Sequence, residues 1–281
     1  MSEVIFAAGC FWGVQFTFDK IYGVLETKVG YVDGKTENPT YNDVCSGITG
    51  HAEAVQVIYN SKIIQLDELI DIFFMIHDPT SVDRQGPDFG TQYRSGIYYY
   101  NSADRAIILK KIKEYSSCFD GPIVTEVKKV DKFWPAEVYH QKYFEKHKTI
   151  GCRFTEVRKE SFLQKKLSPE QYWVMRGKGT EAPFSGEYIY TDEKGIYRCA
   201  ACGQKLFTSE SKFQSDCGWP AFDDSLKGTT KIQKDFSHFM IRDEVICSRC
   251  GSHLGHLFED DETKTGLRYC INSIALKFEE K

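Results

Sequence analysis

Two short cysteine motifs decide how the second half of this chain must fold: residues 198–203 read RCAACG and residues 246–251 read ICSRCG. A two-residue spacer lets one tight turn present two thiolates, and two such turns supply the four ligands of a tetrahedral zinc ion. Redox dithiols and plain buried cysteines are alternatives, but redox dithiols usually occur singly beside a βαβ pattern, which neither motif has. The motifs therefore predict one structural zinc, with the ligands Cys199, Cys202, Cys247 and Cys250.

The distance between the motifs indicates a domain larger than a zinc ribbon. Forty-four residues separate Cys202 from Cys247, more than a short ribbon's loop holds. β-type runs dominate this half, such as GEYIYT at 186–191 and LRYCINSIALKF at 267–278, and Gly and Asp turns separate them. We therefore expect a mostly β domain of antiparallel sheets at 168–281, in which the metal clamps two hairpins together.

The first half alternates strands with helices. Strands are predicted at 3–8, 26–32, 53–59, 95–100 and 123–130. Apolar residues keep helical spacing from Leu66 to Phe74 and from Ala106 to Tyr115, the latter helix starting near Ser102 as N-cap. The pattern lacks all-parallel regularity, so it predicts an α+β two-layer sandwich for residues 1–154. The charged stretch EVRKESFLQKKLSP (156–169) ends in Ser-Pro, and we expect a linker at 155–167.

Composition narrows the function classes. A net charge of −4 and a pI near 6.0 give no general basic field for nucleic acid, and EDDE at 259–262 opposes one locally. No run approaches the roughly 18 apolar residues of a membrane span. MSEVIFAAGCFWG lacks the basic region of a signal peptide. We expect a cytoplasmic protein with reduced thiols, bound to neither membrane nor nucleic acid.

Cys10 stands between a hydrophobic strand and a predicted helix start. Amide groups and the helix dipole at such a place favour an anion, which predicts a lowered pKa and a nucleophile. A buried structural cysteine at a tight turn is the alternative. Two polar loops, PTYNDVCSGITGHAE (39–53) and HDPTSVDRQGPDFGTQYRS (77–95), carry groups that can serve the thiolate. A partly desolvated carboxyl such as Glu53 can stay protonated and act as general acid.

These segments resemble a known family. GCFWG, TYNDVCSGITGHAEAV and HDPTSVDRQGPDFGTQYRS are similar to the signatures of A-type methionine sulfoxide reductases, which reduce the S epimer. YWVMRGKGTEAPFSGEY, DCGWPAF, SHLGHLF and GLRYCINSIALKF resemble those of the B-type enzymes, which reduce the R epimer. The resemblance implies a fused bifunctional reductase that acts on methionine sulfoxide, free or in oxidised proteins under repair, with a ferredoxin-like N-terminal domain.

For the N-terminal domain, the resemblance implies that Cys10 attacks the sulfoxide sulfur and that Glu53 protonates its oxygen. The cysteine is left as a sulfenic acid. Substrate would contact Phe11 and Trp12 at its methyl group, and Tyr41, Asp88 and Tyr93 at its oxygen. The resolving cysteine would be Cys152, which follows HQKYF but lacks the family's usual Gly-Tyr-Cys form. Cys45 and Cys118 are the alternatives if Cys152 does not reach.

For the C-terminal domain, the resemblance implies that Cys270 is the nucleophile and Cys217 its resolving partner. His256 would be the acid, and the substrate would contact Trp219, His253, Arg268 and Asn272. Disulfides Cys10–Cys152 and Cys217–Cys270 need an external dithiol such as thioredoxin to reset them. The competing hypothesis makes the second half a zinc-held binding module that presents substrates to a single catalytic domain.

Overall fold

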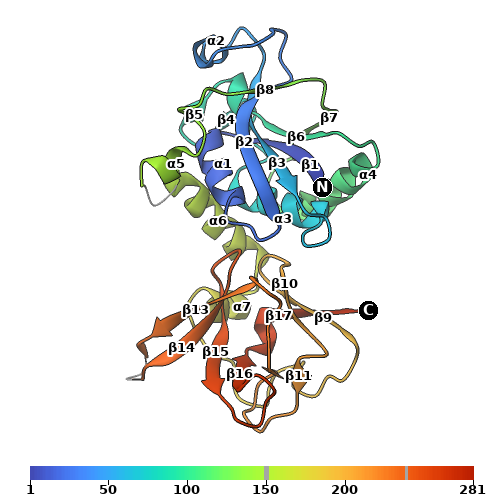
Figure 1. Cartoon of the computed structure of the whole chain (residues 1–281), viewed down its shortest axis with the longest axis vertical. Helices are drawn as coiled ribbons and strands as arrows, with labels where there is room; N and C mark the ends of the chain where they lie inside the picture. Colours follow the sequence, from blue (N-terminus) through green and yellow to red (C-terminus); the bar gives the residue numbers. More distant parts are fainter. Residues whose placement is uncertain (149–151, 238–239) are drawn as a thin grey trace. The chain divides into compact units, whose positions relative to one another are not determined.

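A buried strand organises the first half of the chain. The computed structural model describes three stretches, residues 1–148, 152–237 and 240–281. In the first of them, β1 (Ser2–Ala8) lies between β3 (Ala52–Tyr59) and β6 (Ser95–Tyr99) and runs antiparallel to both (Figure 1). Val4, Ile5, Phe6 and Ala7 have no exposed surface. The strand is continuously apolar because both faces of the sheet are covered.

The complete sheet has six strands in the order β7-β6-β1-β3-β2-β8. The remaining strands are β2 (Val24–Val32), β7 (Glu126–Lys129) and β8 (Phe133–Pro135). All neighbours are antiparallel except β6 and β7, which are parallel. This sheet with its helices confirms the predicted mixture of strands and helices in the N-terminal domain. Strand β8 was not predicted, because three residues ending in proline give no periodicity to recognise.

Alternate side chains of β1 build two packing layers. Phe6 stacks on Phe18 of α1 (Phe11–Phe18) at 4.9 Å between ring centroids, and on Phe73 of α3 (Leu66–Ile76) at 5.2 Å. Ile5 and Ala7 belong to a separate buried cluster with Val32, Ala52, Ala54 and Tyr98. Helix α4 (Asp104–Tyr115) packs on α3, and the short elements are α2 (Tyr41–Cys45), β4 (Arg84–Gln85), β5 (Asp88–Phe89) and α5 (Tyr143–Lys146).

Two local predictions were wrong. Helix α4 has Ala103 rather than Ser102 at its N-cap, without a side-chain hydrogen bond there. Residues 186–191 form turns instead of a strand. There the Tyr188 amide donates to the Ser273 hydroxyl, a side-chain partner in place of a neighbouring strand.

The charged stretch 155–167 is helical over most of its length. Helix α6 (Arg153–Lys166) runs through it, and the two compact units of the chain, 1–162 and 163–281, divide inside it. Glu, Lys, Arg and Gln are good helix formers, so a charged stretch alone does not distinguish a linker from a helix. The Ser-Pro pair starts α7 (Pro169–Met175): Ser168 accepts from the Gln171 amide, and Pro169 takes the first helical position.

The C-terminal unit is rich in strands, as predicted. One sheet has the order β10-β9-β17, and a second has the order β11-β12-β16-β15-β14-β13. Their bounds are β9 (Gly195–Cys199), β10 (Lys205–Thr208), β11 (Lys212–Phe213), β12 (Ala221–Phe222), β13 (Thr230–Asp235), β14 (Arg242–Cys247), β15 (His253–Glu259), β16 (Leu267–Ile271) and β17 (Leu276–Glu280). Every strand pair in both sheets is antiparallel.

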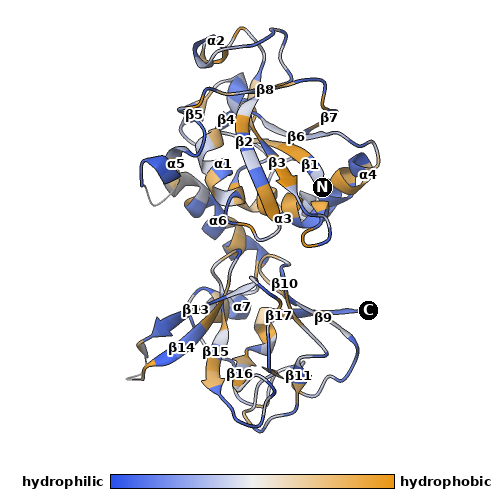
Figure 2. Ribbon diagram, in the orientation of Figure 1, coloured by the Kyte–Doolittle hydropathy of each residue, from blue (hydrophilic) through white to orange (hydrophobic). Residues whose placement is uncertain are grey.

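Stacked aromatic rings fill the core between these strands. Phe207 of β10 stacks on Phe222 of β12 at 4.3 Å, and the Tyr197 ring meets Phe222 edge-on at 5.0 Å. Figure 2 shows the contrast between a core strand and a solvated one: β1 of the first unit is hydrophobic, whereas β13 of the second is largely hydrophilic. None of the helices in the described part of the chain is long and apolar enough to span a bilayer.

Candidate active sites and metal centre

A thiol and a carboxyl meet where β1 ends and α1 begins. Cys10 is the N-cap residue of α1, and its side chain makes no capping hydrogen bond. The next amide, that of Phe11, donates to the Glu53 carboxylate at 3.1 Å. Glu53 comes from β3, the neighbour of β1 in the sheet. Strand pairing therefore delivers the carboxyl to the helix start that carries the thiol.

Burial decides the protonation of both groups. Glu53 is 2% exposed, and burial raises the pKa of its carboxyl from 4.5 to about 8, so it keeps its proton at neutral pH. Burial raises the pKa of Cys10 far above its usual value, and the charge that Glu53 carries once it ionises raises it further. The predicted lowering of the Cys10 pKa is therefore wrong, because desolvation outweighs the amides of the helix start.

Predicted oxygen-binding groups lie in the same electrostatic environment. Burial raises the pKa of Tyr93, and the charges of Glu53, Asp88 and Cys10 raise it further. Burial also raises the pKa of Asp88. Burial and the hydrogen bond with Cys45 raise the pKa of Tyr41 as well. The two polar loops thus bring Asp88 and Tyr93 within interaction range of the Cys10 thiol, and Tyr41 within range of the Glu53 carboxyl.

An aromatic wall with polar supports surrounds the first turn of α1. The Trp12 indole donates to His140 Nδ1 at 3.2 Å and stacks on Tyr143 at 3.8 Å. Glu137 accepts from the Tyr41 amide at 2.8 Å and from the Tyr31 hydroxyl at 2.9 Å. Glu137 and His140 were not predicted as supports from the sequence. A polar pair inside the aromatic run EVYHQKYF (137–144) was the available signal.

The three cysteines considered as resolving partners differ in position. Cys152 packs against α1: a Cβ placed on Gly13 would lie 2.7 Å from Cys152 Cβ and 3.1 Å from its Sγ. The Cys152 charge also contributes to the raised pKa of Cys10. Cys45 is exposed at the end of α2, and Cys118 lies in the short 3-10 helix Ser116–Cys118.

A cavity of about 170 Å³ lies in the C-terminal unit. Most of the residues predicted for that domain's site line it: Cys217, Trp219, His256, Arg268, Cys270 and Asn272. It is completed by Thr180, Arg242, Gly255 and Phe258. The strand register explains the gathering, since Cys270 of β16 pairs with His256 of β15 on one side and with Ala221 of β12 on the other.

The two thiols of this cavity form a hydrogen-bonded pair. The hydrogen bond with Cys270 lowers the pKa of Cys217 to about 5, whereas the same bond and burial raise the pKa of Cys270. The Arg268 guanidinium contributes to stabilising the negative charge on both thiols. The hydrogen bond and the guanidinium together favour a negative charge shared between the two sulfurs.

Each histidine of SHLGHLF is held by a buried carboxylate. His256 Nε2 lies 2.9 Å from Asp235, which also binds Ser237 and Arg242. His253 Nδ1 lies 2.8 Å from Glu244. Burial lowers the pKa of both histidines, although the carboxylates oppose this. His256 lines the cavity, while His253 is not part of its lining.

Glu181 connects several elements around this cavity, and the sequence analysis did not identify it. Its carbonyl accepts from the Trp219 indole at 3.2 Å, and its amide donates to the Asn272 side chain at 3.0 Å. Its carboxylate accepts from the amides of Ser273 and Ile274, directly after β16. Its place in the motif GTEAPF was the only available signal.

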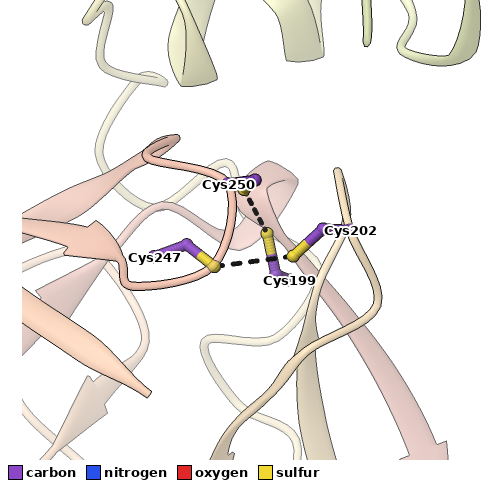
Figure 3. A group of neighbouring side chains, drawn as sticks. All are labelled: Cys199, Cys202, Cys247 and Cys250. Atoms are coloured by element: carbon purple, nitrogen blue, oxygen red, sulfur yellow. Dashed lines mark hydrogen bonds between the residues drawn. The ribbon is translucent and has the colours of Figure 1, made fainter. Parts of the chain in front are cut away.

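The four paired cysteines form a buried cluster. Their sulfur atoms all lie within 4.8 Å of one another (Figure 3), at 3.7 Å for Cys199–Cys250 and 3.5 Å for Cys202–Cys247. Tetrahedral coordination with metal–sulfur bonds of about 2.3 Å requires sulfur–sulfur edges of about 3.8 Å. The donor set therefore fits a metal ion. Two of the cysteines lie at the β9–β10 turn and two at the β14–β15 turn, so the cluster brings together turns from two different sheets.

Comparisons with known proteins match both halves. A family model for peptide methionine sulfoxide reductase matches residues 2–171, and one for the SelR domain matches residues 167–280. Reduced Mxr1 from Saccharomyces cerevisiae is 39% identical, with 54% of this chain and 88% of that chain covered and a TM-score of 0.52. Methionine sulfoxide reductase A of Corynebacterium diphtheriae is 34% identical, with 54% and 77% covered and a TM-score of 0.50.

Proposed function

The chain belongs to the peptide methionine sulfoxide reductase family and carries a SelR domain, so both halves reduce methionine sulfoxide, and we propose that they divide its epimers. In this proposal the N-terminal domain reduces the S epimer and the C-terminal domain reduces the R epimer. The two epimers differ in hand at sulfur, so each needs its own pocket. The protonated Glu53 beside the Cys10 thiol is the observation that carries the N-terminal part.

The first step joins Cys10 to Glu53. A sulfoxide sulfur is a weak electrophile until its oxygen is protonated, and Glu53 holds a proton for it at neutral pH. As Cys10 sulfur attacks, Glu53 gives its proton to the oxygen, and the thiol proton of Cys10 restores the acid. The sulfur–oxygen bond of the substrate breaks, methionine leaves, and Cys10 keeps the oxygen as a sulfenic acid.

Substrate binding in this domain uses the groups around Cys10. We propose that Phe11 and Trp12 contact the methyl group, since Phe11 is buried and Trp12 is fixed by its bond to His140. Tyr41, Asp88 and Tyr93 bind the oxygen, an assignment supported by their electrostatic interactions with Glu53 or Cys10. The polar groups thus surround the atom that gains a proton.

Cys152 completes the N-terminal cycle in our proposal. Its thiol condenses with the Cys10 sulfenic acid, so that a disulfide forms and water leaves. Its packing beside α1 supports this role over Cys45 and Cys118. An external dithiol must then reduce the disulfide, and a thioredoxin-type donor has the low potential that this requires.

In the C-terminal domain, the hydrogen-bonded thiol pair supports Cys270 as nucleophile and Cys217 as its resolving partner. The Cys217 thiolate accepts the hydrogen bond from Cys270, so it can take that proton as Cys270 attacks. The resulting Cys217 thiol then condenses with the Cys270 sulfenic acid, releasing water.

The other polar groups of the cavity bind and protonate the substrate in this proposal. His256 exchanges the proton through Nδ1, because ionised Asp235 fixes Nε2 as its N–H. Trp219 contacts the methyl group, and Arg268 and Asn272 complete the substrate contacts. His253 lies outside the cavity lining, and it supports substrate binding indirectly through β15, the strand that also carries His256.

The buried cysteine cluster binds one structural zinc in our proposal. Four thiolates leave no open coordination position, and the sulfur spacing supports a tetrahedral ion. The metal would hold together the turns of two sheets in the C-terminal domain, rather than take part in the reaction.

We also propose a fold type for the N-terminal domain and bounds for both domains. The strand order β6-β1-β3-β2, with α1 and α3 as connections, supports a ferredoxin-like N-terminal domain. We propose functional domains at 1–154 and 168–281, joined by 155–167. Working thiols support a cytoplasmic location, which cell fractionation would test.

Thioredoxin-driven turnover of the separated epimers tests the whole assignment. Wild type should reduce both epimers, Cys10→Ser only the R epimer, and Cys270→Ser only the S epimer. The other domain in each variant is the internal control for folding. Intact R-epimer turnover in Cys270→Ser would refute that site and favour a zinc-held binding module.

A further inference from the structure

Gly13 is a glycine inside a helix, where this residue weakens helical structure. It is buried in the first turn of α1, three residues after Cys10. A Cβ at this position would lie 2.7 Å from Cys152 Cβ and 3.1 Å from Cys152 Sγ. Non-bonded carbon atoms prefer separations of about 3.5–4.0 Å. An alanine here would therefore have to displace Cys152 by roughly 1 Å.

A helix start fixes the Cys152 backbone on the other side of this contact. The Cys152 carbonyl accepts from the Thr155 hydroxyl at 2.9 Å and from the Glu156 amide at 3.3 Å. Thr155 is itself buried and faces the same position, since its methyl group would lie 3.2 Å from a Cβ on Gly13. Cys152 is thus held between the first turn of α6 and the surface of α1.

We propose that Gly13 is a positioning residue for the second step: its missing side chain leaves a notch in which Cys152 docks before Cys10 is oxidised. Residues three apart on a helix are neighbours on its surface, so this notch adjoins the helix start that carries Cys10. The resolving thiol then waits beside the sulfenic acid instead of searching for it, which raises its effective concentration. This inference rests on the proposed roles of Cys10 and Cys152.

The proposal separates two steps that ordinary turnover combines. In Gly13→Ala the first reduction by Cys10 does not use the notch, whereas disulfide formation requires it. Displacing a reacting group by about 1 Å can slow a step about 100-fold. Alanine is also the better helix former, so the substitution does not weaken α1 by propensity.

The experiment uses the full-length chain with the S epimer and no reductant. Methionine release measures the first step, trapping with a sulfenic-acid reagent measures the intermediate, and quenched mass spectrometry measures the Cys10–Cys152 disulfide. Gly13→Ala should release one methionine per chain, accumulate trapped sulfenic acid, and form the disulfide about 100-fold more slowly than wild type. Its thioredoxin-driven turnover should fall, and R-epimer turnover should stay unchanged.

Two variants calibrate the result. Cys152→Ser sets the limit in which no Cys10–Cys152 disulfide forms. Gly121→Ala is the matched control, because the atoms nearest to a Cβ there belong to Thr80 at an ordinary 3.6–4.0 Å and its backbone needs no positive φ. Wild-type disulfide kinetics in Gly13→Ala would overturn the inference alone, and so would loss of its first methionine. Failure of wild type itself to form the disulfide would instead overturn the proposed function.

Discussion

Replacing Glu53 by glutamine should stabilise the N-terminal domain at neutral pH while removing its acid. Burial raises the pKa of this carboxyl from 4.5 to about 8, whereas the unfolded chain returns it to its ordinary value. Between these two pKa values the unfolded chain binds fewer protons than the folded domain. Stability therefore falls as pH rises through this window and is unaffected by Glu53 below it.

The size of the effect follows from the two pKa values. A pH of 7 is about 2.5 units above the pKa of the carboxyl in the unfolded chain, so that carboxyl is ionised, whereas the carboxyl in the folded domain is still mostly protonated. At 1.36 kcal/mol per unit, this difference lowers the free energy of unfolding by about 3 kcal/mol. Glutamine has no such equilibrium, and its carbonyl can keep the bond from the Phe11 amide. The gain should be about 3 kcal/mol at pH 7 and less than about 1 kcal/mol at pH 5.

Urea unfolding of the full chain at both pH values measures this gain. Hydrogen-exchange protection of peptides from β1 and β3 reports the N-terminal domain, and peptides from β14 and β15 provide the internal reference. S-epimer turnover should fall by about 10²- to 10⁴-fold at the same time, the usual worth of a general acid. A stability change equal at pH 5 and pH 7, or none at either, would refute the reasoning.

Three further predictions concern the thiol pair of the C-terminal cavity, the cysteine cluster and the aromatic core of the N-terminal domain. Alkylation of Cys217 should follow an apparent pKa of about 5, and Cys270→Ala should raise this pKa because the hydrogen bond between the thiols is lost. Labelling at a series of pH values, measured by mass spectrometry, checks this prediction. An unchanged pH profile in the variant would contradict it. Chelation of the proposed zinc should abolish R-epimer turnover and hydrogen-exchange protection of β9 and β14 while S-epimer turnover survives. A chelator-treated protein that keeps R-epimer turnover and this protection would contradict the proposed structural role. Phe6→Ala should destabilise the N-terminal domain by about 3–5 kcal/mol in urea unfolding, because the ring is fully buried between Phe18 and Phe73; a loss below 1 kcal/mol would contradict that packing.

The features readable from sequence are those encoded locally. A two-residue spacer determines how one turn presents Cys199 and Cys202, so the cysteine cluster was predictable without the fold. The apolar run of β1 likewise carries its own signal. Local patterns therefore predicted five strands of the first half, the β-rich character of the second half and the four candidate ligands.

Features that depend on burial or on distant contacts were not readable. The pKa of Cys10 was mispredicted because its sequence displays the helix start but not the desolvation that outweighs it. His140 acquires its role from Trp12, far away in the sequence. The charged residues of α6 are equally compatible with a solvated linker and with a helix, and only the buried Phe162 and Leu163 separate the two.

The unequal exposure of the cysteines bears on how this enzyme ages under oxidants. Cys10, Cys152 and Cys217 are each partly exposed, whereas the four sulfurs of the cysteine cluster are buried. Oxidants dissolved in water therefore reach these three thiols before the cluster, and in the proposed catalytic cycle a reductant reverses the first oxidation. The buried cluster thiols, which hold the C-terminal sheets together in the proposed zinc-bound form, are oxidised only after that domain opens, so oxidation of the three partly exposed thiols precedes loss of the fold.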